Sequence, residues 1–150
     1  MSLIVQSERW REIEEEIRPI YIQHWQEMGL DGNELSLDIE KYRNMDDAGT
    51  LLSVTARKDG RLVGYFLNFI MRHPHYDLLT AAMDVYYLLP EYRVGSNGIR
   101  LFEGTEKECR NRGVGFMLAT ARIDRSAAAG RIFQLMGWKN SRLVYEKKVI

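Results

Sequence analysis

The residues of this chain that are best suited to chemistry lie between positions 84 and 102. Asp84 falls inside an apolar strand pattern, where desolvation should raise the pKa of its carboxyl group. A turn of small residues follows, with Gly95, Ser96 and Gly98, and the apolar spacing after it predicts a helix. Small residues let the backbone approach a ligand, and the first turn of a helix presents unpaired N–H groups. The stretch therefore predicts a phosphate-binding turn beside an ionisable carboxyl group.

General phosphate-binding patterns do not decide what this turn does. Its glycine spacing is G-x-x-G, which differs from the dinucleotide fingerprint G-x-G-x-x-G, and the pattern G-x-x-x-x-G-K-[ST] is absent. A glycine turn between a strand and a helix can also be an ordinary connection, chosen for its backbone geometry. The residues around the turn must therefore carry the interpretation.

The sequence PEYRVGSNG at residues 90–98 resembles the signature P-x-[YF]-[RQ]-x-x-G-x-[GA] of the GCN5-related N-acetyltransferase (GNAT) family. The proline, the tyrosine, the arginine and the last glycine fit. The first family glycine would fall at Ser96, and this chain carries its glycine one place earlier, at Gly95. The continuation to Phe102 is similar to a variant found in phage-type members. The resemblance implies an acyl-CoA-dependent enzyme that moves an acetyl group from acetyl-CoA directly to a primary amine of a small molecule or protein.

The resemblance also implies where acetyl-CoA would bind. Its pantetheine arm would run along the end of the strand that contains Asp84, and its diphosphate would meet the N–H groups of the turn. Two further positions match the family's penultimate helix, where serine and phenylalanine replace the usual asparagine and tyrosine. The predicted cofactor contacts are Leu88, Leu89, Arg93, Val94, Gly95, Ser96, Asn97, Gly98, Ser126 and Phe133.

The predicted catalytic residue is Asp84, which stands where many family members carry a glutamate base. A lysine-like amine with a pKa near ~10.4 is neutral in only about one molecule in ~2,500 at pH 7, a cost of ~4.6 kcal/mol. A base that removes the proton therefore matters, although a buried carboxylate can also be a structural hydrogen-bond acceptor. Phe133 cannot protonate the leaving thiolate. A thiol with a pKa of about ~8.5 leaves tolerably unaided, and Tyr86, Tyr87 and Tyr145 are candidate substitutes.

The order of elements predicts an α/β (α+β) fold: a mixed, mostly antiparallel sheet of six or seven strands with about four helices and a cleft between strands 4 and 5. Asp59 and Gly60 predict a two-residue hairpin turn. Expected strands cover residues 3–5, 50–57, 61–71, 78–89, 114–120 and 143–149. Expected helices begin after Ser7, Ser36 and Gly98, and the first should kink or split at Pro19 and end at Gly29. A last helix is expected to carry Ala129, Ile132, Phe133 and Met136 on one face and to end at Gly137.

Composition narrows the class of protein. The 150 residues suit one domain, and 21 basic against 21 acidic residues argue against a nucleic-acid partner. Apolar runs too short for a bilayer argue against a membrane protein, and a lone buried cysteine, Cys109, favours a reducing cytoplasm. His73 and His75 lack further ligands nearby, so no metal is expected.

The acceptor and the activity stay open at this stage. Acidic loop residues, Asp31, Glu34 and Asp77, mildly favour a cationic amine acceptor. A homodimer is compatible with the resemblance. The alternative to an enzyme is a catalytically silent module of the same fold that binds acyl-CoA or a protein partner, because Ser126 and Phe133 depart from the family pattern.

Overall fold

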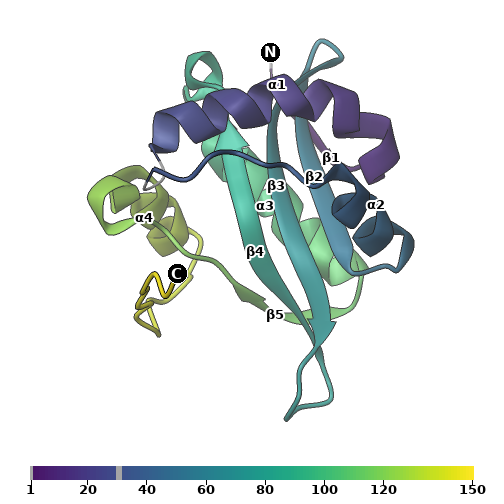
Figure 1. Ribbon diagram of the computed structural model, residues 1–150, viewed down its shortest axis with the longest axis vertical. Coiled ribbons are helices and arrows are strands. Elements are labelled where there is room, and N and C mark those ends of the chain that lie inside the picture. Colours follow the sequence, from purple (N-terminus) through teal and green to yellow (C-terminus); the bar gives the residue numbers. More distant parts are fainter. Residues whose placement is uncertain (1, 30–31) are drawn as a thin grey trace. The chain divides into compact units, whose positions relative to one another are not determined.

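The computed structural model describes residues 2–29 and 32–150, apart from the side chains of Arg125 and Ser126. Its internal contacts group the chain into two compact units, Met1–Thr120 and Ala121–Ile150. The first unit contains β1 (Ile4–Ser7), α1 (Trp10–Met28), α2 (Ile39–Asp47), β2 (Leu51–Lys58), β3 (Arg61–Arg72), β4 (Leu79–Leu88), the 3-10 turn η1 (Pro90–Tyr92), α3 (Asn97–Asn111) and β5 (Val114–Leu118) (Figure 1). The second contains η2 (Ile123–Arg125) and α4 (Ser126–Leu135).

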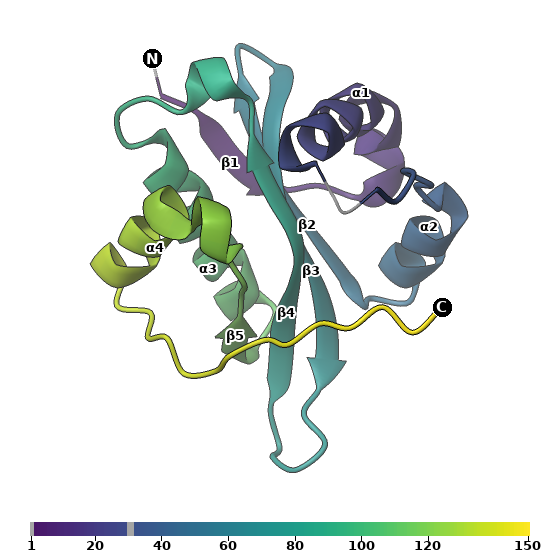
Figure 2. The ribbon, with the colours of Figure 1, turned by 60° about the vertical axis from the view of Figure 1, so that its left-hand side comes forward.

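One mixed sheet organises the first unit. Its strands lie in the order β1-β2-β3-β4-β5, with antiparallel pairs up to β4 and a parallel pair of β4 with β5. A parallel neighbour needs a crossover, and α3 supplies it. Helices α1 and α2 cover one face of the sheet and α3 covers the other (Figure 2). The predicted mixed, mostly antiparallel architecture is confirmed.

The central strands are buried on both sides because helices cover both faces. Residues 51–56 of β2 and 62–68 of β3 are all buried, and these include the polar residues Ser53, Thr55 and Asn68. The two-residue turn between these strands is confirmed: Asp59 and Gly60 have φ values of 49° and 80°. Positive φ at both positions gives the type I′ twist that matches a hairpin.

Two predicted helix caps were wrong. Ser7 is the last residue of β1, paired with Val54, so strand pairing overrides its capping preference, and α1 begins after Arg9. Helix α2 begins after Asp38, whose carboxylate accepts a hydrogen bond from the Lys41 N–H at 2.9 Å, rather than after Ser36. Pro19 lies within α1 without splitting it, whereas Gly29 ends the helix at φ 56°, as predicted.

The predicted closing strand at residues 143–149 was wrong, and the sheet has five strands instead of six or seven. Alternating apolar residues form a strand only where a sheet edge supplies backbone partners. The second unit contains no strand in its described residues, so this pattern has no such edge within it. The apolar side chains of the segment are exposed accordingly: Leu143, Val144, Tyr145 and Val149.

Helix α3 packs so closely on β1 that Gly104 has no room for a side chain. A Cβ atom there would lie 2.3 Å from Cγ1 and 2.9 Å from Cβ of Val5. We expect Gly104→Ala to lower the free energy of unfolding by about 1–3 kcal/mol through overpacking, measured by urea denaturation. Combining it with Val5→Ala should recover part of this loss, so costs that simply add would contradict the proposed clash.

Candidate active site

Asp84 lies where β4 departs from regular pairing. Leu67 of β3 pairs with Val85 and Asn68 pairs with Met83, so Asp84 is the extra residue of a bulge. Its carboxylate is half-buried and its Oδ2 accepts a hydrogen bond from the Tyr42 hydroxyl. Burial raises the pKa of Asp84 above the usual aspartate value, as predicted, while the Tyr42 hydrogen bond and the charge of Lys41 oppose the rise.

Aromatic and polar side chains from α1 surround this part of β4. His24 stacks on Tyr87 with ring centroids 4.4 Å apart, and its Nδ1 lies 2.8 Å from the Tyr65 hydroxyl. Burial lowers the pKa of His24 to about 4, so the ring is neutral at pH 7. Tyr21 stacks on Tyr65 with ring centroids 5.9 Å apart. The face of β4 toward α1 therefore combines one carboxylate with uncharged aromatic groups.

On its opposite edge, β4 pairs with β5 over only part of its length. Only Leu79–Ala82 of β4 pairs with β5, through residues Val114 to Leu118. From Met83 onward β4 has no strand on this side in the described sheet, because β5 ends at Leu118, which pairs with Ala82. Leu89 donates its N–H to the Val63 carbonyl of β3 at 2.9 Å, and strand alternation then turns the Leu88 peptide groups toward the unpaired edge.

The turn at residues 93–98 is open to solvent. Its first four residues are exposed, and Asn97 and Gly98 are half-buried. The N–H groups of Arg93 and Asn97 bond within the turn, to the carbonyls of Pro90 and Val94, respectively. Among the described residues, the N–H groups of Val94, Gly95, Ser96 and Gly98 have no acceptor. Side chains do not cover this turn, so its unpaired N–H groups can donate hydrogen bonds to an anion.

The side chain of Arg93 has partners within the chain. Its terminal nitrogens donate to both carboxylate oxygens of Glu27 at 2.6 and 2.9 Å, and its Nε donates to the Leu88 carbonyl at 2.7 Å. Its guanidinium also lies 4.9 Å from the centre of the Tyr87 ring. The arginine therefore ties the turn to α1 and holds one backbone group that the sequence analysis assigned to pantetheine. Contact between Arg93 and a phosphate stays a prediction.

The sequence analysis missed Tyr42 and Glu27. Neither residue stands out in the sequence, because neither belongs to a motif. Glu27 accepts hydrogen bonds from both Arg93 and the Tyr87 hydroxyl, which is 2.5 Å away. These interactions lower the pKa of Glu27 to about 2, with the Arg93 hydrogen bonds as the largest cause. Sequence patterns hold no local signal for contacts between such distant positions.

The remaining predicted contacts and alternatives lie elsewhere. In the second unit, α4 carries Phe133, whose ring is 4.9 Å from that of Trp138, and the backbone of Ser126. Of the tyrosines considered as acids, Tyr87 donates to Glu27 and has a pKa raised to about 12, whereas Tyr145 is exposed. Burial also raises the pKa of Tyr86, which packs against Phe66. Because these pKa values are raised, the hydroxyls of Tyr86 and Tyr87 are poor proton donors to a leaving thiolate.

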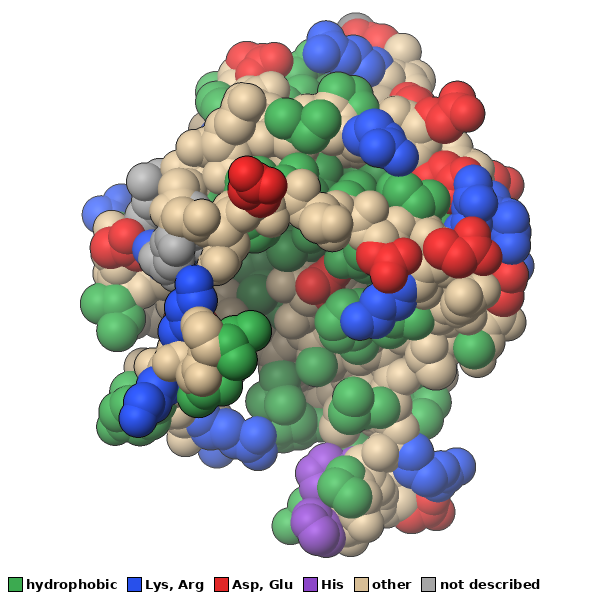
Figure 3. Space-filling view, in the orientation of Figure 1, with side chains coloured by type: hydrophobic (Ala, Val, Ile, Leu, Met, Phe, Trp, Pro, Cys, Tyr) green, Lys and Arg blue, Asp and Glu red, His purple; other side chains and the backbone are tan. Residues whose placement is uncertain are grey.

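The hairpin between β3 and β4 carries His73 and His75 at the surface, where histidine side chains gather (Figure 3). The two residues bond to each other, with the His75 N–H 3.1 Å from Nδ1 of His73. No group of three potential metal ligands occurs among the described residues. Of the acidic loop residues, Asp77 pairs with Arg72, Glu34 is exposed, and Asp31 lies outside the described residues.

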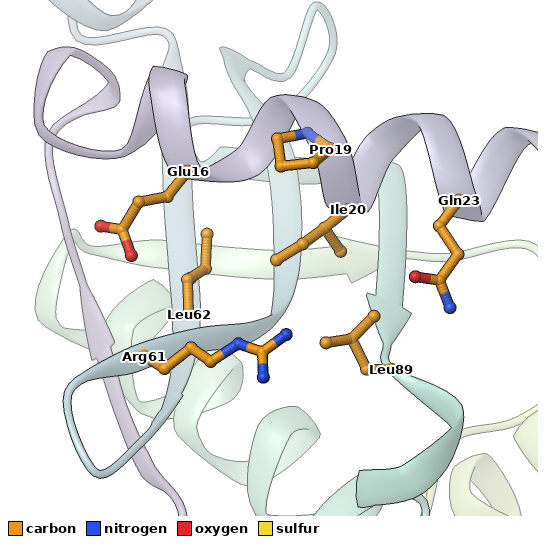
Figure 4. A pocket seen from close by; sticks show the side chains of 7 residues that line it. All are labelled: Glu16, Pro19, Ile20, Gln23, Arg61, Leu62 and Leu89. Atoms are coloured by element: carbon orange, nitrogen blue, oxygen red, sulfur yellow. The ribbon is translucent and has the colours of Figure 1, made fainter.

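A groove of about 260 Å³ opens between α1 and the ends of β3 and β4. It is lined by residues of α1 and β3, including Ile20, Gln23 and Arg61, and by Leu89, which follows β4 (Figure 4). Ligand sites are usually larger, roughly 300–1,000 Å³, and mostly apolar. The groove is therefore too small for acetyl-CoA, but it places the Leu89 side chain on the α1 side of β4.

Comparison with known proteins decides the family. The family model described as "Acetyltransferase (GNAT) family" matches residues 10–138, which is most of the chain. The chain belongs to the GNAT acetyltransferase family. By that membership it is an acetyltransferase, and the resemblance in the signature at residues 90–98 is confirmed. No curated protein sequence matches the chain.

Solved GNAT structures share the fold at low sequence identity. An aminoglycoside acetyltransferase from an uncultured soil metagenomic sample, in complex with sisomicin, has a TM-score of 0.80 and 11% identity, covering 99% of this chain and 96% of that one. A ribosomal-protein-alanine N-acetyltransferase from Brucella melitensis biovar Abortus 2308 has a TM-score of 0.75 and 14% identity, covering 99% of both chains.

A third similar structure is AAC(6')-Iy in complex with a bisubstrate analog, CoA-S-monomethyl-acetylneamine. It has a TM-score of 0.76 and 17% identity and covers 100% of both chains. The acceptors named in these structures differ, so the shared fold leaves the acceptor of this GNAT member undetermined. No helix in the described part of the chain has the length and apolarity to cross a bilayer.

The ion pair of Glu27 with Arg93 should make stability depend on pH. Because the folded-state pKa of Glu27 is about 2, below its usual 4.5, the stabilisation is present above pH 4.5 and is lost as pH falls toward 2. We expect Glu27→Gln to lower the free energy of unfolding at pH 7 by about 1–2 kcal/mol, discounted for solvent screening. The gap from wild type should narrow at pH 3.

Urea denaturation at the two pH values measures both effects. Glu91→Gln is the matched control, because Glu91 is exposed on η1 and has no ion pair among the described residues. This control removes the same charge and should leave the pH dependence unchanged. An equal loss in both variants would show that net charge, rather than the contact with Arg93, sets the effect.

Proposed function

We propose that this GNAT member is a cytoplasmic N-acetyltransferase that moves the acetyl group of acetyl-CoA directly onto a primary amine. The observation that carries the proposal is the edge of β4 that lacks a paired strand after Ala82, together with a turn whose N–H groups are unpaired. An extended arm can pair with the open edge of β4 while a diphosphate binds the turn. A bisubstrate analog containing CoA, bound to a protein of the same fold, supports this donor.

On the donor side, the proposal assigns the diphosphate to the amides of Val94, Gly95, Ser96 and Gly98. Arg93 either keeps its ion pair with Glu27 and fixes the turn, or releases Glu27 and binds the phosphates. The arm would follow the edge of β4 at Leu88 and Leu89. The Leu89 N–H and carbonyl already bond to Val63 and Tyr92, and the Leu88 carbonyl accepts from Arg93, so the Leu88 N–H is the better candidate. Ser126 and Phe133 remain proposed contacts from the second unit.

On the acceptor side, Asp84 is the proposed general base. The neutral amine attacks the thioester carbonyl carbon, the nitrogen–carbon bond forms as the carbon–sulfur bond breaks, and Asp84 takes the amine proton directly or through a water. The thiolate of CoA leaves and is protonated by solvent, since a thiol pKa of about 8.5 makes it a tolerable leaving group. Phe133 at the usual tyrosine position is compatible with this route.

The proposed acceptor is a cationic amine on a small molecule or a protein. An aminoglycoside acetyltransferase and a ribosomal-protein-alanine N-acetyltransferase of the same fold support both kinds of acceptor. The charge of Asp84 and the surrounding tyrosines favour a cation, which carboxylates and aromatic faces both attract. The alternative function is a catalytically silent module that binds acyl-CoA or a protein partner. It is still motivated by Ser126 and Phe133, which depart from the family pattern.

Replacing Asp84 separates these two functions. We expect Asp84→Asn to lower kcat/KM by about 10²–10⁴-fold while the Kd for acetyl-CoA, measured by calorimetry, stays within a few-fold of wild type. Wild-type kcat/KM should rise with pH through an apparent pKa above 3.8, the usual aspartate value. Asp59→Asn is the matched control, because Asp59 lies in a distant hairpin turn. Full activity of Asp84→Asn would refute the assigned base.

A valine at Gly95 tests the diphosphate site. Gly95 has φ +55° with open space around its Cα, so valine there is strained by its backbone and the turn must change shape. We expect the Kd for acetyl-CoA to rise about 10-fold or more, whereas the KM for acetyl-pantetheine, which lacks the diphosphate, stays near the wild-type value. Gly49→Val is the control, since Gly49 has φ +74° and open space in the turn after α2. Equal loss with both donors would contradict the site.

A further inference from the structure

The two oxygens of the Asp84 carboxylate have different surroundings. Oδ2 accepts a hydrogen bond from the Tyr42 hydroxyl, whereas Oδ1 has no hydrogen bond to any described residue. Asp84 itself occupies the bulge in β4 and lacks a directly opposed residue in β3. Regular strand pairing therefore does not orient this side chain, and the contact with α2 must do so.

Tyr42 is held firmly enough to orient its partner. Its ring stacks on Trp10 with centroids 4.5 Å apart and an interplanar angle of 20°, and Trp10 is fully buried. The ring of Tyr42 is thus held in place by α1.

The helix that carries Tyr42 is also anchored to α1. Arg43 donates to both carboxylate oxygens of Glu14, at 2.5 and 2.8 Å. Arg9 donates to the buried carboxylate of Asp46 at 2.7 Å. Ion pairs with two hydrogen bonds give orientation as well as attraction. Helix α2 is therefore pinned immediately beside Tyr42 and again one turn later.

We propose that Tyr42 is a positioning residue for acetyl transfer, whose hydroxyl fixes Oδ2 of Asp84 and leaves Oδ1 to take the proton of the acceptor amine. This inference rests on the proposed function. Tyr42 is not the acid that protonates the thiolate, because its pKa is raised far above the usual tyrosine value by burial and by the charge of Asp84. A phenol held in that state keeps its proton and donates it to Oδ2 throughout the reaction.

The same contact opposes the effect of burial on Asp84. Burial raises the pKa of Asp84, whereas the Tyr42 hydrogen bond and, to a smaller extent, the charge of Lys41 lower it, both from α2. Tyr21 on α1 and Tyr65 on β3 also face the carboxylate, whose charge raises the pKa of both hydroxyls. Removing this hydroxyl should leave a carboxyl that protonates at higher pH and is free to rotate.

Tyr42→Phe tests the inference, since the ring can keep its stack on Trp10. We expect the pKa of Asp84, followed by carbon-13 NMR of the labelled carboxyl group in the free protein, to rise by about one unit. The acid limb of the pH profile of kcat/KM should move by the same amount. Replacing Tyr42 by 3-fluorotyrosine, a more acidic phenol and stronger donor, should lower the pKa of Asp84. An unchanged Asp84 titration in both variants would reduce Tyr42 to a packing residue.

A double-mutant cycle shows whether Tyr42 acts through Asp84. In the Asp84→Asn background, Tyr42→Phe should have no further effect on kcat/KM, whereas a persisting loss would overturn the positioning role. The two hypotheses fail differently. If Asp84→Asn alone keeps full activity, the proposed base is wrong. If Asp84→Asn abolishes transfer but the Asp84 titration ignores Tyr42, the base stands and the positioning role falls.

Discussion

The structure depends on where the backbone of β4 finds its hydrogen bonds. A buried strand needs partners on both edges, because unpaired N–H and C=O groups are costly away from water. β3 satisfies one edge along the whole of β4, but β5 satisfies the other edge only as far as Ala82. The bulge residue Asp84 lies two positions further along, just past the end of this pairing. The unpaired N–H and C=O groups of this edge, next to a carboxylate, can form hydrogen bonds with an extended ligand.

Helix α1 contacts residues at both ends of that edge. Near the bulge, it holds Tyr42 through the stack of its ring on Trp10. Past the end of β4, Glu27 holds Arg93, and Arg93 holds the Leu88 carbonyl. The ion pair is partly exposed, so its contribution to stability is modest, but its two parallel hydrogen bonds define a geometry. One helix therefore sets the spacing between the proposed base and the turn assigned to the diphosphate.

Local patterns explain which parts of this arrangement follow from the sequence. The hairpin at Asp59, the helix end at Gly29 and the open turn at Gly95 each need a positive φ, and glycine or aspartate marks such positions. The parallel placement of β5 followed from the helix crossover. The contact of Tyr42 with Asp84 joins residues 42 positions apart, and that of Arg93 with Glu27 joins residues 66 positions apart. No periodicity or turn signal encodes such pairs, because they exist only after the helices pack.

The wrong closing strand illustrates the same limit from the other side. Residues 143–149 alternate as a strand should, but a strand is a relation between two segments and not a property of one. The cap prediction at Ser7 was wrong for a related reason. Its side chain suits a helix cap, but its backbone is paired with Val54 in the sheet. In both cases a local preference was correct and the competing partner, or its absence, decided the outcome.

As the proposed general base, Asp84 needs a pKa that burial raises, but not so far that the carboxyl group is neutral at the working pH. A base works best when its pKa approaches the working pH, and desolvation moves an aspartate in that direction. Full desolvation would go too far, because a carboxyl group that is neutral at pH 7 cannot accept a proton from an amine. The Tyr42 hydroxyl and the charge of Lys41 oppose the shift, and the Tyr42 contact uses only Oδ2. A half-buried carboxylate with one oxygen bound and one free meets both demands, which an exposed or a fully paired aspartate would not.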